Sequence, residues 1–122
     1  MKDHPPILKI NVSNLDDKKI YQVVELRGEM DKVGLDQVKA PLEKLVESFG
    51  CKYLVFDCKE LAYINSDSIG FLMSLHAHLA KENKHLVIVD ARANVHDILE
   101  AIGVLTVFEY YANLEEFKKK IA

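Results

Sequence analysis

Apolar and polar residues alternate along two segments near the start of the chain. The first covers residues 7–12. The second, residues 20–27, reads IYQVVELR and is rich in β-branched and aromatic side chains. Alternation with a period of two is typical of β-strands, and the polar segment 15–19 between them has the composition of a turn. We therefore predict an N-terminal β-hairpin whose second strand ends at Gly28-Glu29-Met30-Asp31.

After residue 31 the apolar residues recur at the spacing of an α-helix. This spacing predicts helices over residues 35–49, 66–82, 95–102 and 114–121. Pro41 lies inside the first of them and is expected to weaken or kink it. Gly50 is the candidate for the C-cap of that helix.

Short, wholly apolar runs separate the predicted helices. Residues 53–56 and 86–89 are of this kind, which is typical of strands covered on both faces. A last strand is expected at 107–110. Asp57 is expected to end the first of these strands, and the segment from Cys58 to Asn65 is expected to be a loop.

The resulting order of elements is β-β-α-β-α-β-α-β-α. A hairpin followed by alternating helices and strands indicates an α/β fold with a mainly parallel central sheet, crossover connections and about four helices. A chain of 122 residues has the length of one domain. We predict a single domain over residues 1–122, with its core at about residues 7–121.

Composition and charge exclude several classes of protein. Hydrophobic residues make up 49% of the chain, which is enough for a core and argues against disorder. The net charge of −3 disfavours nucleic acid as a partner. No apolar run reaches the roughly 20 residues of a membrane span, so direct membrane insertion is not expected. Because the N-terminus lacks the pattern of a secretion signal, we predict a cytoplasmic protein whose cysteines, Cys51 and Cys58, stay reduced.

The sequence carries little that is typical of an enzyme. Its glycines are scattered, so it has neither a glycine-rich phosphate loop nor a nucleophile elbow. Asp57 and Asp90, at the expected ends of two central strands, are a candidate pair for Mg²⁺, but capping of loops or helices explains them better. We interpret His76 as a satisfied core or interface histidine and His96 as part of a solvated helix face. No catalytic residue, metal site or cofactor is expected.

The most unusual local sequence is Asn65-Ser66-Asp67-Ser68, four small polar residues ahead of an amphipathic helix. Such residues cap a helix by accepting hydrogen bonds from its free N–H groups, and one cap needs only one of them. A helix N-terminus also favours an anion or a phosphorylated residue. Capping and a phosphate-dependent function both remain open from this pattern.

The order of elements and this motif together resemble the STAS domain of anti-sigma factor antagonists, over roughly residues 7–121. The resemblance rests on Gly28-Glu29-Met30-Asp31, Leu54-Val55-Phe56-Asp57 with Leu61-Ala62-Tyr63-Ile64, Asn65-Ser66-Asp67-Ser68-Ile69-Gly70, the segment from Asn94 to Val104, and Leu114-Glu115-Glu116. It implies a regulatory protein that acts without catalysis, by binding a serine-kinase-type anti-sigma factor.

The resemblance also implies partner switching under the control of phosphorylation. The family signature reads Asp-Ser-Ser/Thr-Gly-Leu-Gly, and its second Ser or Thr is interpreted as the residue that the partner kinase phosphorylates. Here Asn65 stands at the first position, Ser66 is kept, Asp67 stands at the phosphoacceptor position and Ser68 replaces the glycine. Phospho-regulation is therefore expected to be lost or altered. Asp67 is either a partial mimic of the phosphorylated state or part of a changed partner surface, and Ser66 and Ser68 are the remaining candidate phosphoacceptors.

The expected partner surface is centred on the start of this helix. It combines the motif, the side of the helix expected to be exposed, and the turn after the second strand: Asn65, Ser66, Asp67, Ser68, Gly70, Phe71, Ser74, Leu75, His78, Glu29 and Asp31. The alternative function is an accessory subunit of a membrane transport complex, because the same fold serves there. A metal-dependent enzyme that uses Asp57 and Asp90 is a distant third.

Overall fold

The computed structural model describes residues 8–13 and 15–122. Its strands are β1 (Lys9–Val12), β2 (Tyr21–Met30), β3 (Tyr53–Ile64), β4 (His85–Val89) and β5 (Glu109–Tyr111). Its helices are α1 (Lys32–Glu47), α2 (Ser66–Ala80), α3 (Ala93–Ile102), the short 3-10 helix η1 (Val104–Thr106) and α4 (Leu114–Ile121). The predicted order of elements is confirmed, with η1 added ahead of β5.

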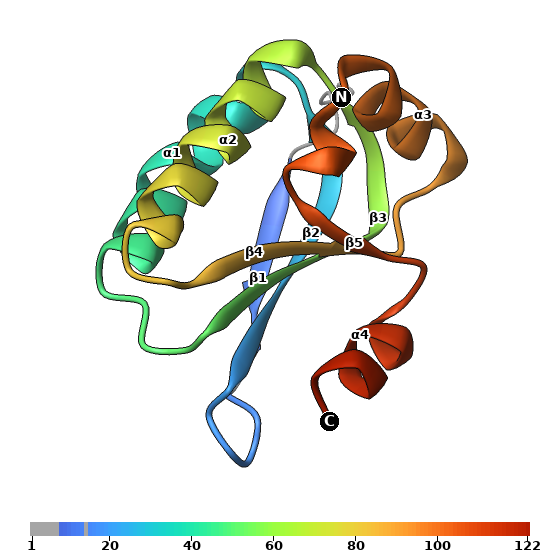
Figure 1. The fold of residues 1–122 in the computed structure, drawn as a ribbon. Coiled ribbons are helices and arrows are strands. Elements are labelled where there is room, and N and C mark those ends of the chain that lie inside the picture. The colour runs from blue at the N-terminus through green and yellow to red at the C-terminus, as the bar shows by residue number, and fades with distance from the viewer. Residues whose placement is uncertain (1–7, 14) are drawn as a thin grey trace.

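The strands form one sheet in the order β1-β2-β3-β4-β5. β1 pairs with β2 in antiparallel fashion, as the predicted hairpin requires, and the other neighbours are parallel. Each parallel connection passes through a helix, so the sheet is the mainly parallel α/β sheet expected from the sequence. The carboxyl ends of β2 and β3 therefore lie side by side at one edge, where α1 and α2 begin (Figure 1).

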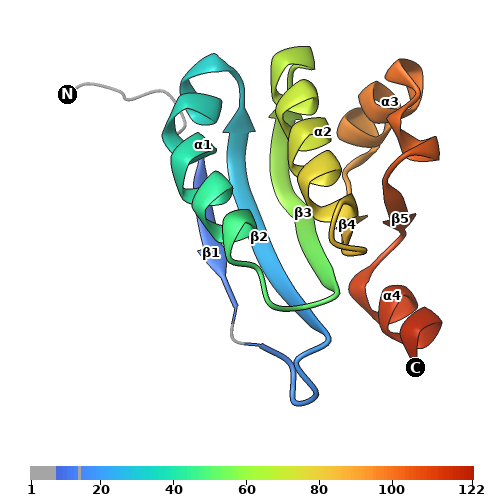
Figure 2. The ribbon, with the colours of Figure 1, turned by 60° about the vertical axis from the view of Figure 1, so that its left-hand side comes forward.

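Three helices cover one face of the sheet and α4 lies against the other. Figure 2 shows α1, α2 and α3 in front of the strands, with α4 apart from them below β5. The side chains of β3 alternate between the two layers. Leu54 and Phe56 join the large core under α1, α2 and α3, whereas Val55 joins a smaller core with Phe117 of α4. The central strands are thus covered on both faces, as their apolar runs predicted.

One buried aromatic side chain, with the partly buried Leu114 and Ile121 beside it, packs α4 on the sheet. The ring of Phe117 is fully buried, and its centroid lies 5.5, 5.3 and 5.6 Å from those of Tyr21, Tyr53 and Tyr111. Burial of a phenylalanine stabilises a fold by about 1.5–3 kcal/mol. The lysines of the last turn, Lys118–Lys120, complement the negative end of the helix dipole.

The upper parts of β2 and β3 are paired strands, so the predicted break at Gly28 and the predicted loop after Asp57 are both wrong. The structure pairs Gly28 with Leu61 and Met30 with Ile64. Two register shifts interrupt this ladder, and Gly28 has a φ of 117°. Bulges of this kind change the face on which the following side chains lie, so the period of two is lost although the strands continue.

The ends of α1 also differ from the prediction. The helix begins at Lys32 rather than Leu35, and it is capped at its end by Ser48 rather than by Gly50. It continues through Pro41, whose side chain is exposed. β5 begins later than the predicted residue 107, because η1 and a turn occupy the preceding residues.

Candidate functional site

Asn65 caps α2 at the point where β3 ends. Its backbone is extended, and its side-chain Oδ1 accepts a hydrogen bond of 2.8 Å from the backbone N–H of Ser68. Such a cap contributes about 1 kcal/mol to stability. The first residue of the motif therefore has a structural role that accounts for its amide side chain.

Ser68 is fully buried, and its hydroxyl ties α2 to the end of β2. Oγ donates a hydrogen bond of 2.8 Å to the carbonyl oxygen of Met30. The same carbonyl accepts a hydrogen bond of 3.1 Å from the backbone N–H of Asn65. The expectation that Ser68 belongs to an exposed surface is wrong, because the polar side chain is used inside the protein. A kinase has no access to this hydroxyl in the folded chain.

Ser66 and Asp67 form the exposed first turn of α2. The first N–H groups of a helix have no acceptor within the helix, and the helix dipole adds a positive potential there. A carboxylate in this turn gains about 0.3–1 kcal/mol from that potential. Of the four polar residues in the motif, Ser66 and Asp67 are the two exposed ones, Asn65 is half-buried and Ser68 is buried.

The start of α1 lies beside the start of α2. Asp31 caps α1, since its Oδ1 accepts a hydrogen bond of 2.9 Å from the backbone N–H of Gly34. A Cβ atom at Gly34 would clash with the carbonyl oxygen of Glu29, so this close approach requires a glycine. The structure therefore brings Glu29 and Asp31 close to the motif, but as half-buried supports of α1.

The outer side of α2 is less exposed than predicted. Phe71 and Leu75 have only 6% and 3% of their surface exposed, so the expectation that they offer an apolar contact is wrong. Gly70, Ser74 and His78 are exposed as expected. The difference arises because α2 packs against α1 as well as against the sheet, and it therefore buries two stripes instead of one.

A shallow groove runs between α1 and α2, and we refer to it as the α1–α2 groove. It consists of two adjoining hollows of about 360 and 380 Å³ that share Glu43 and Ser74. The first also contains Asp67, and the second contains His78. The groove is lined by Lys32, Leu35, Asp36, Lys39, Glu43, Val46, Glu47, Asp67, Phe71, Ser74, Leu75 and His78. It continues from the exposed start of α2 along the interface of α1 and α2 as far as His78.

Asp57 and Asp90 lie at neighbouring strands, as predicted, because Asp57 pairs with Val89, but Asp57 does not end its strand. Asp57 lies within β3 and is nearly buried; its Oδ1 accepts a hydrogen bond of 3.0 Å from the backbone N–H of Lys59. Asp90 follows β4 with a φ of 62°. In the described part of the chain, neither belongs to a group of three potential metal ligands. The two carboxylates therefore gain no third His, Cys, Asp or Glu ligand from the described residues.

One such group does occur among the described residues, on the surface of α3. It consists of His96, Asp97 and Glu100, whose potential ligand atoms lie within 4.8 Å of one another. Asp97 and Glu100 are exposed, as expected for the solvated face of a helix.

The two cysteines are free, as predicted, and both are buried. Burial, with additional repulsion from Asp57 and Asp90, raises the pKa of the Cys58 thiol to about 12. Burial also raises the pKa of the Cys51 thiol. A thiol becomes a nucleophile by losing its proton, so neither side chain is suited to that role near neutral pH.

His76 is not a satisfied core histidine within the described chain, and the other predicted role, that of an interface histidine, stays a prediction. Its ring lies 5.8 Å from that of Phe108, with an edge-on geometry. Its Nδ1 atom is buried without a hydrogen-bond partner in the described part of the chain. The apolar stripe correctly indicated partial burial but carried no information about a partner for this nitrogen.

Sequence reasoning missed two features of the site. The first is the Met30 carbonyl, a backbone group that leaves no trace in residue type. The second is the α1 side of the groove, formed by Lys32, Lys39, Glu43 and other polar residues. Their spacing of three and four residues indicated a polar helical stripe, but not that a second helix would lie alongside it.

Among the described residues, no helix combines the length and the hydropathy needed to cross a bilayer. The five-stranded sheet, with helices on both faces and a polar helix start at its edge, defines a small, mainly parallel α/β domain. The chain belongs to the STAS domain family, because the model of that family matches residues 13–117.

Solved structures of anti-sigma factor antagonists share this fold. One from Mycobacterium paratuberculosis has a TM-score of 0.77 at 22% identity, with 89% of each chain covered. SpoIIAA in its unphosphorylated form has a TM-score of 0.76 at 14% identity, covering 93% of this chain and 96% of that one. SpoIIAA of Bacillus in its phosphorylated form has a TM-score of 0.68 at 13% identity, covering 93% and 100%. At these identities the likeness concerns the fold.

Proposed function

We propose that this chain is a cytoplasmic regulator of the anti-sigma factor antagonist kind, which binds a kinase-type anti-sigma factor and performs no catalysis itself. The observation that carries the proposal is the first turn of α2, where the exposed hydroxyl of Ser66 lies next to the exposed carboxylate of Asp67 on a STAS fold. Structures of the same fold described as anti-sigma factor antagonists, one of them phosphorylated, support this class of function.

Asp67 places a permanent negative charge where the resemblance assigns the phosphate. A phosphoserine carries about −1.5 to −2 charges at neutral pH, whereas a carboxylate carries one. Asp67 therefore reproduces part of the repulsion and of the desolvation cost that a phosphate imposes on a partner. We infer that the resting protein binds its kinase partner more weakly than a variant without this charge.

Ser66 is the hydroxyl that remains open to phosphorylation. Ser68 is buried and its hydroxyl donates a hydrogen bond to the carbonyl oxygen of Met30, whereas Ser66 is exposed at the first position of α2. The step would transfer the γ-phosphoryl group of ATP to Oγ of Ser66, with loss of the hydroxyl proton and release of ADP. A phosphate on Ser66 would add to the negative charge of Asp67. The two charges together would impose on the partner the full repulsion and desolvation cost, of which the carboxylate alone supplies a part.

Affinity capture of the tagged full chain from its host, followed by mass spectrometry, tests the class of partner. We expect an ATPase of the histidine-kinase-like kind, with or without a sigma factor. A transporter ATPase captured with its membrane subunits would contradict the proposal and favour a role as a transport accessory subunit.

Variants of the first turn then test the site itself. We expect Asp67→Ser to tighten binding of the captured kinase by about tenfold, which corresponds to 1.4 kcal/mol. Ser66→Ala should abolish phosphorylation by that kinase with ATP. Asp97→Ser on α3 and Ser48→Ala at the end of α1 are exposed control variants far along the chain from this turn. If Asp67→Ser and Asp97→Ser bind the kinase alike, Asp67 is not a switch position.

A further inference from the structure

The α1–α2 groove carries an excess of negative charge that the described protein does not neutralise. Glu43 and Glu47 follow one another at a spacing of four residues and line the same hollow. No cation of the described residues lies within 4.0 Å of either carboxylate. In contrast, Lys32 pairs with Asp36 at 3.8 Å at the other end of α1. The charge excess is therefore concentrated at one end of the groove.

These two glutamates lie where a helix tolerates them poorly. Like charges four residues apart destabilise a helix by a few tenths of a kcal/mol, about the amount that opposite charges contribute. Glu47 is also the last residue of α1, where the helix dipole favours a positive charge. The arrangement costs stability in the isolated chain, and a cation in the groove would reverse that cost.

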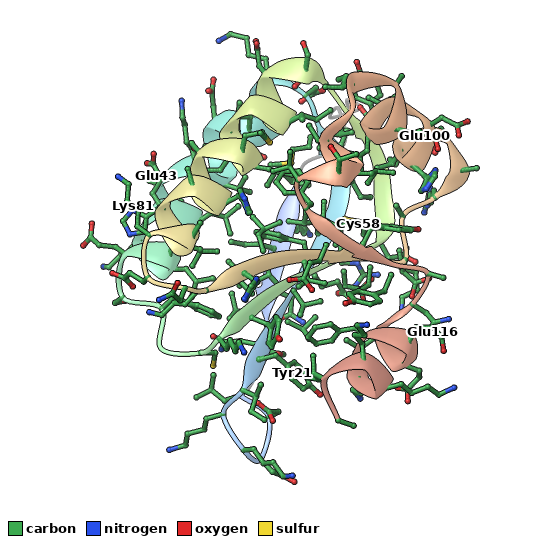
Figure 3. All side chains as sticks on the ribbon, viewed as in Figure 1. Tyr21, Glu43, Cys58, Lys81, Glu100 and Glu116 are labelled. Carbon is green, nitrogen blue, oxygen red and sulfur yellow. The ribbon has the colours of Figure 1, made fainter. Side chains whose placement is uncertain are left out.

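The floor of the same hollow is apolar. Val46 of α1 and Leu75 of α2 form it, and Ser74 and His78 stand on the opposite rim from the glutamates. Figure 3 labels Glu43 on the outer side of the two helices, away from the sheet. Lys81, which is labelled on the same side, makes no ion pair within 4.0 Å in the described structure. The hollow thus offers two carboxylates without an ion pair among the described residues, above side chains that are already buried.

We propose that the α1–α2 groove docks a basic segment of the protein partner, with an arginine or lysine between Glu43 and Glu47. The inference rests on the proposed function, because this segment belongs to the protein that binds the first turn of α2. The two places are continuous: the neighbouring hollow shares Glu43 and Ser74 and ends at Asp67. From Asp67 to His78 the rim is about 16 Å long at 1.5 Å per residue, which suits a segment of several residues.

The groove is tested with a defined peptide on the full chain. The probe is an acetylated and amidated hexapeptide of leucine, arginine and alanine, titrated to about 1 mM and followed by the amide resonances of the protein. The control peptide has glutamate in place of arginine. We expect the arginine peptide to shift amides of the C-terminal half of α1 and of Ser74 to His78, and to lose this effect at high salt. No shifts, or the same shifts with both peptides, would overturn the inference.

Two double variants with the same change in net charge distinguish binding in the groove from attraction by the overall charge of the protein. Glu43→Lys with Glu47→Lys should weaken peptide binding by about tenfold, the combined effect of two exposed ion pairs lost and replaced by repulsion. Asp97→Lys with Glu100→Lys changes the net charge equally on the surface of α3, and it should leave binding unchanged. Equal weakening by both double variants would show nonspecific attraction and overturn the proposal.

The same variants distinguish this inference from the proposed function. If kinase capture responds to Asp67→Ser while the arginine peptide fails to shift the groove, the groove proposal is wrong and the proposed function stands. If the peptide binds the groove while the Asp67→Ser variant captures the kinase as the unchanged protein does, the proposed switch is wrong and the docking surface stands.

Discussion

Replacement of Ser68 by alanine is the sharpest test of the link between α2 and β2. The variant removes the 2.8 Å hydrogen bond from Oγ to the carbonyl oxygen of Met30. That carbonyl keeps its bond from the backbone N–H of Asn65, so no buried acceptor is left without a partner. The additional penalty of about 1–3 kcal/mol for an unsatisfied buried group therefore does not apply.

The expected cost of Ser68→Ala is accordingly that of one neutral hydrogen bond, about 1 kcal/mol. For a chain of 122 residues this corresponds to a melting temperature lower by roughly 4 °C. Urea denaturation at equilibrium measures the free energy of unfolding directly. Ser66→Ala is the matched control, and because its side chain is exposed we expect a change within about 0.5 kcal/mol.

Two results would refute the reasoning. Equal destabilisation by Ser66→Ala and Ser68→Ala would mean that the buried hydroxyl contributes nothing specific. Loss of phosphorylation in Ser68→Ala, with kinase binding and stability unchanged, would mean that Ser68 is reached by the kinase and that the assignment of Ser66 as the accessible hydroxyl is wrong.

Two further predictions concern the backbone at α1 and the thiol in β3. Gly34→Ala should destabilise the protein by about 1–3 kcal/mol, because the added methyl group meets the carbonyl oxygen of Glu29. Gly70→Ala on α2 meets no other atom and should stabilise the protein by up to about 1 kcal/mol. Urea denaturation of both variants measures the two changes. The free energy of unfolding should fall between about pH 9 and pH 12, because the folded chain holds the proton of the Cys58 thiol up to about pH 12, whereas an unperturbed thiol has a pKa of 9.0. Cys58→Ala should flatten this part of the stability profile, and an unchanged slope would contradict the assignment.

The sequence predicted the order of elements because most of them bury one regular stripe. β4 is the clearest example, since its whole apolar run is buried between the two helical layers. The same reasoning failed in the upper part of β3. There, register shifts against β2 move successive side chains between the two faces of the sheet. The alternation of apolar and polar residues with a period of two is lost, so the sequence predicts a loop.

The sequence predicted the position of the candidate site correctly, but it predicted the exposure and contacts of only some of its residues. The motif lies at the start of α2, and Ser66 and Asp67 are exposed as expected. Residue type could not reveal that Ser68 points inward, because its partner is a backbone carbonyl 38 residues away along the chain. Nor could it reveal that Phe71 is covered by a neighbouring helix, because packing between two helices depends on the whole sheet.

The weak attachment of α4 should let this helix detach from the sheet before the rest of the protein unfolds. Phe117 is the one buried residue of this eight-residue helix, and a helix so short is marginal in water once it leaves its support. Withdrawal of that ring, together with the partly buried Leu114 and Ile121, frees the helix while the large core beneath α1, α2 and α3 stays intact. Amide protons of α4 should therefore exchange with solvent through a local opening of lower free energy than global unfolding. Each such opening uncovers Val55, Val87 and Val89, so the chain briefly presents an apolar sheet face without unfolding.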